Sequence, residues 1–197
     1  MKDTKEHITR TAFLLFLQKS YKAVTLKDII SATGLSNGAF YHYFESKEQL
    51  FKELVNTYLL RFARQIYEYY PKDSLWNFIQ DTLNDTEDIH KKIDEFLMQG
   101  DGYNYLFFMF EAMRQFPEIQ VEVNQIHKLE FAAWVEIIDI ARAKGEIRTE
   151  LPTELVARMF IYMPDGSYMD FMLDKNLTKY RLGHRRLWEG LYNMLKA

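Results

Sequence analysis

Five side chains that carry rings follow one another at residues 40–44, in the order FYHYF. Phe40 and Phe44 stand four residues apart, a spacing that places both rings on the same face of a helix. We therefore expect these two phenylalanines to pack in a core. The three rings between them then fall on the remaining arc of the helix.

The remaining arc carries groups suited to nucleic acid, namely Asn37, Tyr41, His42 and Tyr43. Amide, phenol and imidazole groups form hydrogen bonds with phosphate oxygens and with the edges of bases. Gly38 and Ala39 are small, so the backbone near the start of this helix can approach the floor of a DNA groove. Lys47 begins the next helix, where an ammonium group and a helix N-terminus together favour phosphate. The pattern indicates a surface that contacts DNA.

A second pattern suits metal chemistry. Glu87 and His90 have the Glu-x-x-His spacing of helical di-iron proteins, which need two such motifs. No acidic residue stands three positions before any of the other histidines, His7, His42, His127 and His184. The chain also lacks cysteine and a glycine-rich phosphate loop. We therefore expect no enzyme, metal or cofactor; a helical adaptor that binds protein and a metal enzyme using Glu87 and His90 stay open as alternatives.

Charge and composition divide the chain. Residues 1–50 carry seven Lys or Arg and five Asp or Glu, a charge of +2, and the remainder carries −5, which together give the net charge of −3. The head is thus mildly basic and the body acidic. The absence of cysteine fits a reducing compartment, and neither a signal peptide nor a run of roughly 20 apolar residues is present. We expect a soluble, cytoplasmic protein.

Apolar residues recur at steps of three and four almost throughout, which predicts an all-α fold of about nine helices. The N-terminal helices are expected over residues 4–20, 26–33, 36–44 and 46–70. Thr25, Ser36 and Ser46 are the expected N-caps of the last three helices. Gly34 and Pro71 are expected to end the second and the fourth helix. Two short helices joined by a tight turn form a helix-turn-helix. In the body, polar residues 84–88 either interrupt the fifth helix or form its solvated face.

Further breaks are expected at residues 100–102 and at Pro117. The last three helices are expected over residues 118–144, 153–173 and 177–196, with Thr153 as a cap and Gly145 after the first of them. The segment Pro164-Asp165-Gly166 should kink or split the second of these helices.

Residues 25–51, TLKDIISATGLSNGAFYHYFESKEQLF, closely resemble the DNA-binding segment of the TetR/AcrR family of transcriptional regulators. The specific features are the threonine before the second helix, the glycine of the turn, Tyr-x-x-Phe, Ser-Lys-Glu and the following Leu-Phe pair. Beyond residue 70 the resemblance concerns architecture alone. It implies a three-helix DNA-binding head over residues 1–46 and a larger regulatory body over residues 47–197.

The resemblance also implies roles for residues of the head. The family positions of Thr25, Tyr41 and Lys47 contact phosphate. Other family positions lie at or near base edges, and they correspond to Lys27, Ser36, Asn37, Gly38 and His42. Many members have histidine where this chain has Tyr43, and His42 stands one place earlier, so either ring is a candidate for reading a base.

For the body, the resemblance implies a homodimer whose protomers pair through their last two helices. The residues selected for this interface are Phe160, Met163, Tyr168, Phe171, Leu187, Leu191, Met194 and Leu195. It further implies a repressor released from a near-palindromic operator by a small, apolar or aromatic effector that enters the body. The residues selected for that pocket are Phe62, Tyr103, Phe107, Phe110, Arg114, His127, Trp134 and Asp165. Apolar stripes of this kind are usually packing, so a filled core is the alternative to a pocket.

Overall fold

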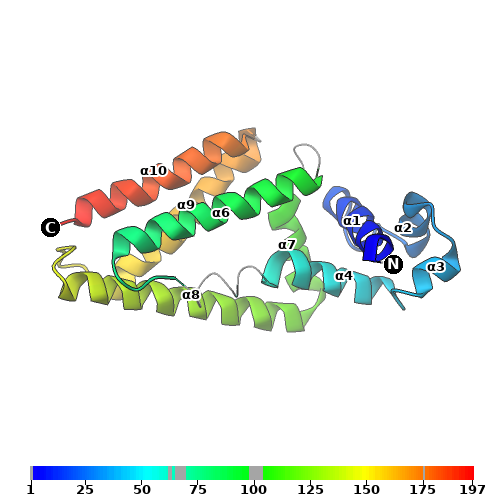
Figure 1. The fold of residues 1–197 in the computed structure, drawn as a ribbon, viewed down its shortest axis with the longest axis horizontal. Coiled ribbons are helices and arrows are strands. Elements are labelled where there is room, and N and C mark those ends of the chain that lie inside the picture. The colour runs from blue at the N-terminus through cyan, green and yellow to red at the C-terminus, as the bar shows by residue number, and fades with distance from the viewer. Residues whose placement is uncertain (1, 62–63, 65–69, 98–103, 175) are drawn as a thin grey trace. The chain divides into compact units, whose positions relative to one another are not determined.

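The computed structural model of the chain describes residues 2–61, 64, 70–97, 104–174 and 176–197 (Figure 1). Those residues form nine α-helices and a π-helical segment, with no strand, which confirms the all-α prediction. The elements are α1 (Lys2–Gln18), α2 (Leu26–Thr33), α3 (Asn37–Tyr41), α4 (Lys47–Val55), the π-helix η1 (Asn56–Leu60), α6 (Leu75–Leu97), α7 (Asn104–Gln115), α8 (Pro117–Ala143), α9 (Thr153–Asp174) and α10 (Leu177–Leu195). Among the described helices, none is long and apolar enough to cross a membrane.

The chain divides into two compact units, each built from two stretches of sequence. The first unit contains residues 1–63 and 92–123, and the second contains residues 64–91 and 124–197. The predicted head of residues 1–46 lies within the first unit. The predicted boundary between residues 46 and 47 stays a prediction.

Aromatic rings fill the core of the first unit. Phe51 of α4 meets Phe16 of α1 edge to face, with ring centres 4.9 Å apart. Phe108 of α7 lies 4.9 Å from Phe51 and 5.1 Å from Phe13 of α1. Aromatic pairs at such distances stabilise the fold by more than the burial of their surface area alone. Phe108 therefore joins α7 to α1 and α4.

The core of the second unit centres on Trp134 of α8, which is fully buried. Its ring stacks on Phe160 of α9 at 4.7 Å and meets Trp188 of α10 at 5.0 Å. Helices α9 and α10 lie side by side, as the orange and red ribbons of Figure 1 show. The Trp188 indole N–H also donates to the carbonyl oxygen of Phe160 at 2.7 Å.

The loop after α8 ties three parts of the second unit together. Gly145 ends α8 in the left-handed conformation, at φ 71°. The Glu146 carboxylate then accepts the backbone N–H groups of Leu75 and Trp76, both at 2.9 Å, and the Tyr192 hydroxyl at 3.2 Å. A carboxylate at a helix N-terminus satisfies N–H groups that have no partner within the helix. Glu146 thus caps α6 and holds α10 beside it.

The structure decides one open alternative for the body and changes the expectations for α9. Helix α6 is continuous through residues 84–88, so these residues do not interrupt it. Helix α9 continues through Pro164 without splitting, and Pro164 is buried. Helix α9 begins at Thr153 itself, and the Thr153 hydroxyl donates to the Asp139 carboxylate at 2.6 Å. The break expected at residues 100–102 lies outside the described residues.

Candidate nucleic-acid interface

Local hydrogen bonds fix the two helices of the predicted helix-turn-helix. The Thr25 hydroxyl accepts the backbone N–H of Asp28, and the Asp28 carboxylate accepts the N–H of Thr25, which completes a capping box before α2. Gly34 ends α2 in the left-handed conformation, at φ 67°. The Ser36 hydroxyl then accepts the N–H of Ala39 and caps α3. These caps confirm the predicted limits of α2 and the predicted start of α3.

Helix α3 has a packed face and an exposed face. Phe40 and Phe44 are fully buried, as predicted. The Tyr41 ring is 52% exposed. Of the other predicted contact residues on this segment, Ser36, Asn37, Gly38 and His42 are exposed, and Ala39 and Tyr43 are half-buried. The structure therefore separates packing rings from exposed rings as the spacing indicates.

The third helix is shorter than predicted. It ends at Tyr41, and the backbone N–H groups of Tyr43 and Phe44 both donate to the carbonyl oxygen of Phe40 in the turn that follows. Residues 42–45 form this turn and lead to α4, whose N-cap is Ser46. His42 and Tyr43 thus lie in the turn and not on the helix itself.

A depression of about 480 Å³ lies between α2 and α3. Its lining includes three predicted contact residues, Lys27, Asn37 and Tyr41. An ammonium, an amide and a phenol on one surface can together bind phosphate oxygens and base edges. The individual contacts with DNA stay predictions.

The capping box also engages Thr25, a predicted phosphate contact. Its hydroxyl donates to Asp28 Oδ2 at 2.6 Å. The side-chain and backbone hydrogen bonds from Thr25 lower the pKa of the Asp28 carboxyl. Asp28 was not among the residues selected from the sequence, although Thr-x-x-Asp before an apolar run is the pattern of a capping box. A phosphate that contacts the Thr25 hydroxyl would have to share it with Asp28.

The Lys47 ammonium binds the protein's own backbone. Its Nζ donates to the carbonyl oxygens of Tyr21 and Val24, both at 2.8 Å, and lies 4.2 Å from the centre of the Tyr21 ring. Burial lowers the pKa of Lys47, and the charge of Glu111 partly opposes this shift. An ammonium group has three N–H donors, so two serve to hold α4 against the segment before α2. The third remains for the predicted phosphate contact.

Replacing Lys47 with alanine should lower the free energy of unfolding by about 1–2 kcal/mol, because two carbonyl groups lose a charged donor. Denaturation in urea measures this change. If the third N–H binds phosphate, the slope of the logarithm of the DNA-binding constant against the logarithm of the salt concentration should also become shallower by about one unit. Lys27→Ala is the matched control, since Lys27 is exposed and its loss should alter the salt dependence alone. An unchanged denaturation midpoint for Lys47→Ala would contradict the role in folding.

The residues selected for an effector pocket divide between the two units. Phe62 and Tyr103 lie outside the described residues. The first unit contains Phe107, Phe110 and Arg114, and the second contains His127, Trp134 and Asp165. In the first unit, Phe107, Phe110 and Arg114 line the same cavity.

The three pocket candidates of the second unit have different surroundings. Trp134 is fully buried in the core of the second unit. His127 is exposed, and its Nδ1 lies 3.4 Å from the Glu130 carboxylate. Asp165 keeps exposed surface, although neighbouring atoms desolvate its carboxyl group and raise its pKa against the opposing effect of His127. Pocket roles for these residues stay untested.

Half of the residues selected for a dimer interface belong to the protomer's own interior. Buried are Phe160, Phe171, Leu191 and Leu195. Half-buried are Met163, Tyr168 and Leu187, and Met194 is exposed. Other apolar side chains of the same two helices face outward, namely Leu155, Tyr162, Met169, Leu173 and Leu182. These outward residues were not among those selected from the sequence.

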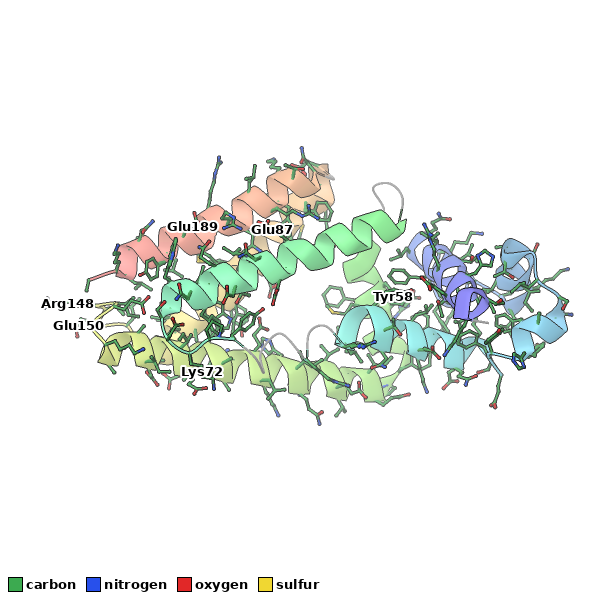
Figure 2. The ribbon with its side chains drawn as sticks, in the orientation of Figure 1. Tyr58, Lys72, Glu87, Arg148, Glu150 and Glu189 are labelled. Atoms are coloured by element: carbon green, nitrogen blue, oxygen red, sulfur yellow. The ribbon has the colours of Figure 1, made fainter. Side chains whose placement is uncertain are left out.

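Glu87, from the alternative metal site, pairs with a neighbouring helix. Figure 2 labels Glu87 on α6 and Glu189 on α10. Arg185 Nη2 lies 2.8 Å from Glu87 Oε1, and Arg185 Nη1 lies 3.5 Å from Glu189 Oε1. The side chain of His90 is not among those described. No group of His, Cys, Asp or Glu suited to a metal ion occurs among the described residues.

A capped α2, a left-handed turn and an α3 with one buried and one exposed face define a helix-turn-helix DNA-binding regulator. Residues 8–54 match the family described as "Bacterial regulatory proteins, tetR family". The HTH-type transcriptional regulator YfiR of Bacillus subtilis is 26% identical over 173 residues, which cover 84% of this chain and 82% of that protein. The HTH-type transcriptional repressor KstR2 of Mycolicibacterium smegmatis is 25% identical over 165 residues, 78% of this chain and 72% of that protein.

Solved structures share the fold. A structure described as a SmeT–triclosan complex superposes on this chain with a TM-score of 0.70 at 16% identity. The match covers 99% of this chain and 92% of the chain in that structure. The family match over residues 8–54 and the relatives that span most of the chain support a transcriptional regulator of the TetR family. Its relatives are transcription factors and not enzymes.

Proposed function

We propose that this regulator is a cytoplasmic repressor that binds a near-palindromic operator as a homodimer and leaves it when a small-molecule effector binds. The observation that carries the proposal is the exposed arc of the head, where Asn37 and Tyr41 line one depression with Lys27. Buried Phe40 and Phe44 hold this arc in place. The relative KstR2 is described as a repressor, which supports the direction of regulation.

Each protomer would insert one α3 into the major groove. Two such helices in a dimer read half-sites about one helical turn, or 34 Å, apart, so a two-fold symmetric protein implies a near-palindromic operator. Tyr41 and Lys47 would contact phosphate, and Asn37 and His42 would reach base edges. The half-site spacing is the feature that a ligand would alter.

The outward face of α9 is the proposed dimer contact. Leu155, Tyr162 and Met169 recur every seven residues, which places them on one stripe, and Leu173 continues it one turn later. Met169 is 58% exposed and Leu173 is 77% exposed. Exposed apolar side chains that recur on one face of a helix are candidates for a protein contact site.

An effector would act by binding one arrangement of the heads better than the other, because a ligand shifts an equilibrium by its difference in affinity for the two states. A solved structure of similar fold is described as a SmeT–triclosan complex, which supports a small-molecule effector. Within the first unit, Lys52 of α4 pairs with Glu118 at the start of α8 at 2.7 Å. The hydrogen bonds of Lys52 to Glu118 and Glu48 raise its pKa to about 12. This pair is a route from the regulatory helices to the head.

Replacing Asn37 with alanine should weaken operator binding by about 10–100-fold, because a bidentate contact to a base contributes about 1–3 kcal/mol of discrimination. Binding to random duplex should change less than about twofold, since phosphate contacts supply that affinity. Fluorescence anisotropy with both duplexes measures the ratio. Asn124→Ala, an exposed asparagine of α8, is the control. Equal losses on both duplexes would contradict base recognition by Asn37.

The operator can be found by anisotropy against tiled duplexes from upstream of the protein's own coding region, with random duplex as competitor and salt varied. A tight signal that resists competitor and weakens with salt on one tile is the expected result. No binding to any duplex at low salt would refute the proposed function.

A further inference from the structure

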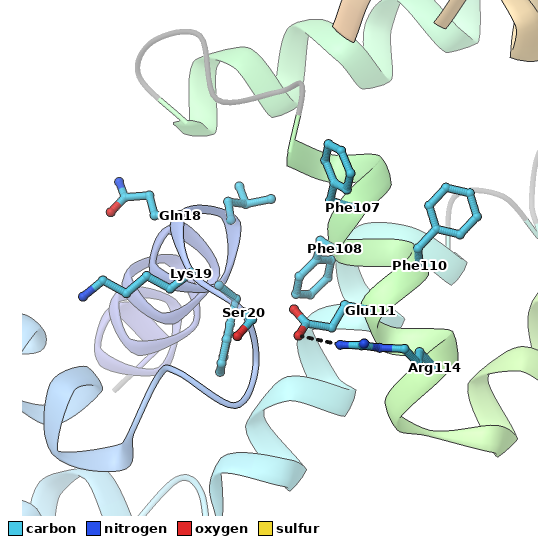
Figure 3. A pocket seen from close by; sticks show the side chains of 10 residues that line it. Gln18, Lys19, Ser20, Phe107, Phe108, Phe110, Glu111 and Arg114 are labelled. Carbon is cyan, nitrogen blue, oxygen red and sulfur yellow. Dashed lines mark ion pairs between the residues drawn. The ribbon is translucent and has the colours of Figure 1, made fainter. Parts of the chain in front are cut away.

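A cavity of about 370 Å³ lies within the first unit, between the C-terminal end of α1 and helix α7 (Figure 3). Residues 16–20 line one side. Helix α7 lines the other side with three phenylalanines, Glu111 and Arg114. Sites for small molecules are mainly apolar, hold a few polar groups and occupy roughly 300–1,000 Å³. This cavity is therefore large enough for a small ligand.

The phenylalanines of α7 differ in burial. Phe108 is held in the aromatic core by Phe13 and Phe51, so it forms a fixed floor. Phe107 and Phe110 are 53% and 54% exposed. Aromatic faces attract cations as well as apolar groups. The rim of the cavity thus has apolar surface that a ligand can cover.

Glu111 supplies a negative charge to the cavity and is itself half-buried. Its Oε1 is buried and accepts no hydrogen bond from the described residues. Arg114 Nη2 forms an ion pair with it at 3.8 Å, drawn as a dashed line in Figure 3, but the Arg114 side chain is 75% exposed, so solvent weakens the pair. Figure 3 shows the Glu111 carboxylate extending from α7 toward α1 near Ser20. A buried carboxylate oxygen without a donor lowers stability, and a ligand that brings a donor or a positive charge removes that cost.

The other charged groups nearby are already engaged or point elsewhere. The Lys19 side chain extends away from α7 in Figure 3. Lys47 is bound to two backbone carbonyl groups. Helix α1 ends at this cavity, and Lys19, which directly follows the helix, partly offsets the negative end of its dipole. A cationic ligand would share the Glu111 carboxylate with the exposed Arg114 side chain.

We propose that this cavity binds a small organic cation with an apolar group, with Glu111 as its counter-ion and Phe107 against its apolar surface. Because α1 belongs to the reading head and α7 packs on it through Phe108, an occupant would alter the packing that positions the head. That regulatory consequence rests on the proposed function, whereas binding itself does not.

Isothermal titration calorimetry of the full chain with benzyltrimethylammonium tests the site, with phenylacetate as the anionic probe. We expect the cation to bind and Glu111→Gln to weaken it by at least about tenfold, because a charged partner is lost. Phe107→Leu, at an exposed position that tolerates change, should weaken it several-fold. Asp165→Asn, the matched carboxyl change in the second unit, should leave the affinity unaltered.

Three results would overturn the proposal: no binding of the cation, equal binding by the Glu111→Gln variant, or preferential binding of phenylacetate that Arg114→Gln abolishes. Anisotropy on operator DNA without any probe separates this inference from the proposed function. If the wild-type chain binds no DNA, the proposed function fails while the calorimetric result still decides the site. If DNA binding is intact and Glu111→Gln binds the cation normally, the inference alone fails.

Discussion

Replacing Trp188 with alanine is expected to lower the free energy of unfolding by about 4 kcal/mol. The ring is almost fully buried and meets Trp134 and His184 edge to face, at 5.0 and 4.3 Å. The substitution leaves a cavity at the centre of the second unit and also removes the indole N–H. Urea denaturation followed by circular dichroism measures the loss.

The indole N–H has a specific task, because Pro164 lies inside α9. In a regular helix the N–H of residue 164 would donate to the carbonyl oxygen of Phe160, and proline has no N–H. The Trp188 indole donates to that same carbonyl at 2.7 Å. Helix α10 thus supplies the donor that α9 lacks, which explains why α9 continues through Pro164.

Two variants separate the hydrogen bond from the packing. Trp188→Phe keeps an aromatic ring and should cost about 1–3 kcal/mol, mostly from the unsatisfied carbonyl. Adding Pro164→Ala restores a backbone donor, so the double variant should recover part of that loss. Strictly additive effects would show that the indole does not compensate for the proline.

Replacing both Met169 and Leu173 with glutamate should convert a dimer into monomers and reduce operator affinity by more than about 100-fold. Burying two unpaired carboxylates in an apolar contact is strongly unfavourable, and a monomer binds one half-site in place of two. Light scattering and anisotropy measure the two effects. Val121→Glu with Leu129→Glu, two exposed apolar residues of α8, is the matched control and should stay dimeric.

A dimer that survives the α9 substitutions would place the contact elsewhere. Removing α10 is a weaker test, because its buried residues Trp188, Leu191 and Leu195 belong to the core of the second unit. Their loss would unfold that unit whether or not α10 touches a partner. Surface substitutions avoid this ambiguity.

Local features of the head could be predicted from the sequence. Thr25, Gly34 and Ser36 act within three residues of the groups they cap, so short sequence patterns suffice to predict their roles. The burial of Phe40 and Phe44 follows from helical spacing in the same way. Spacing could not reveal which contacts come from distant parts of the chain.

Two cases show where the sequence was insufficient. Phe160 and Leu191 were selected for a dimer contact, yet both are buried within the protomer. Periodicity identifies an apolar stripe, but it does not say whether the stripe meets the same chain or another copy. Similarly, the continuity of α9 depends on Trp188 of another helix, which no local pattern around Pro164 contains.

The carboxylate of Glu146 has a consequence for how the chain acquires its structure during synthesis. The N-terminus of α6 receives its cap only after residue 146 has left the ribosome, and Tyr192 completes the same contact later still. Residues of the first unit end at 123, so all of them emerge before the second unit is complete. The DNA-reading head can therefore fold on the nascent chain, while the helices that carry the proposed dimer contact assemble last and pair after release.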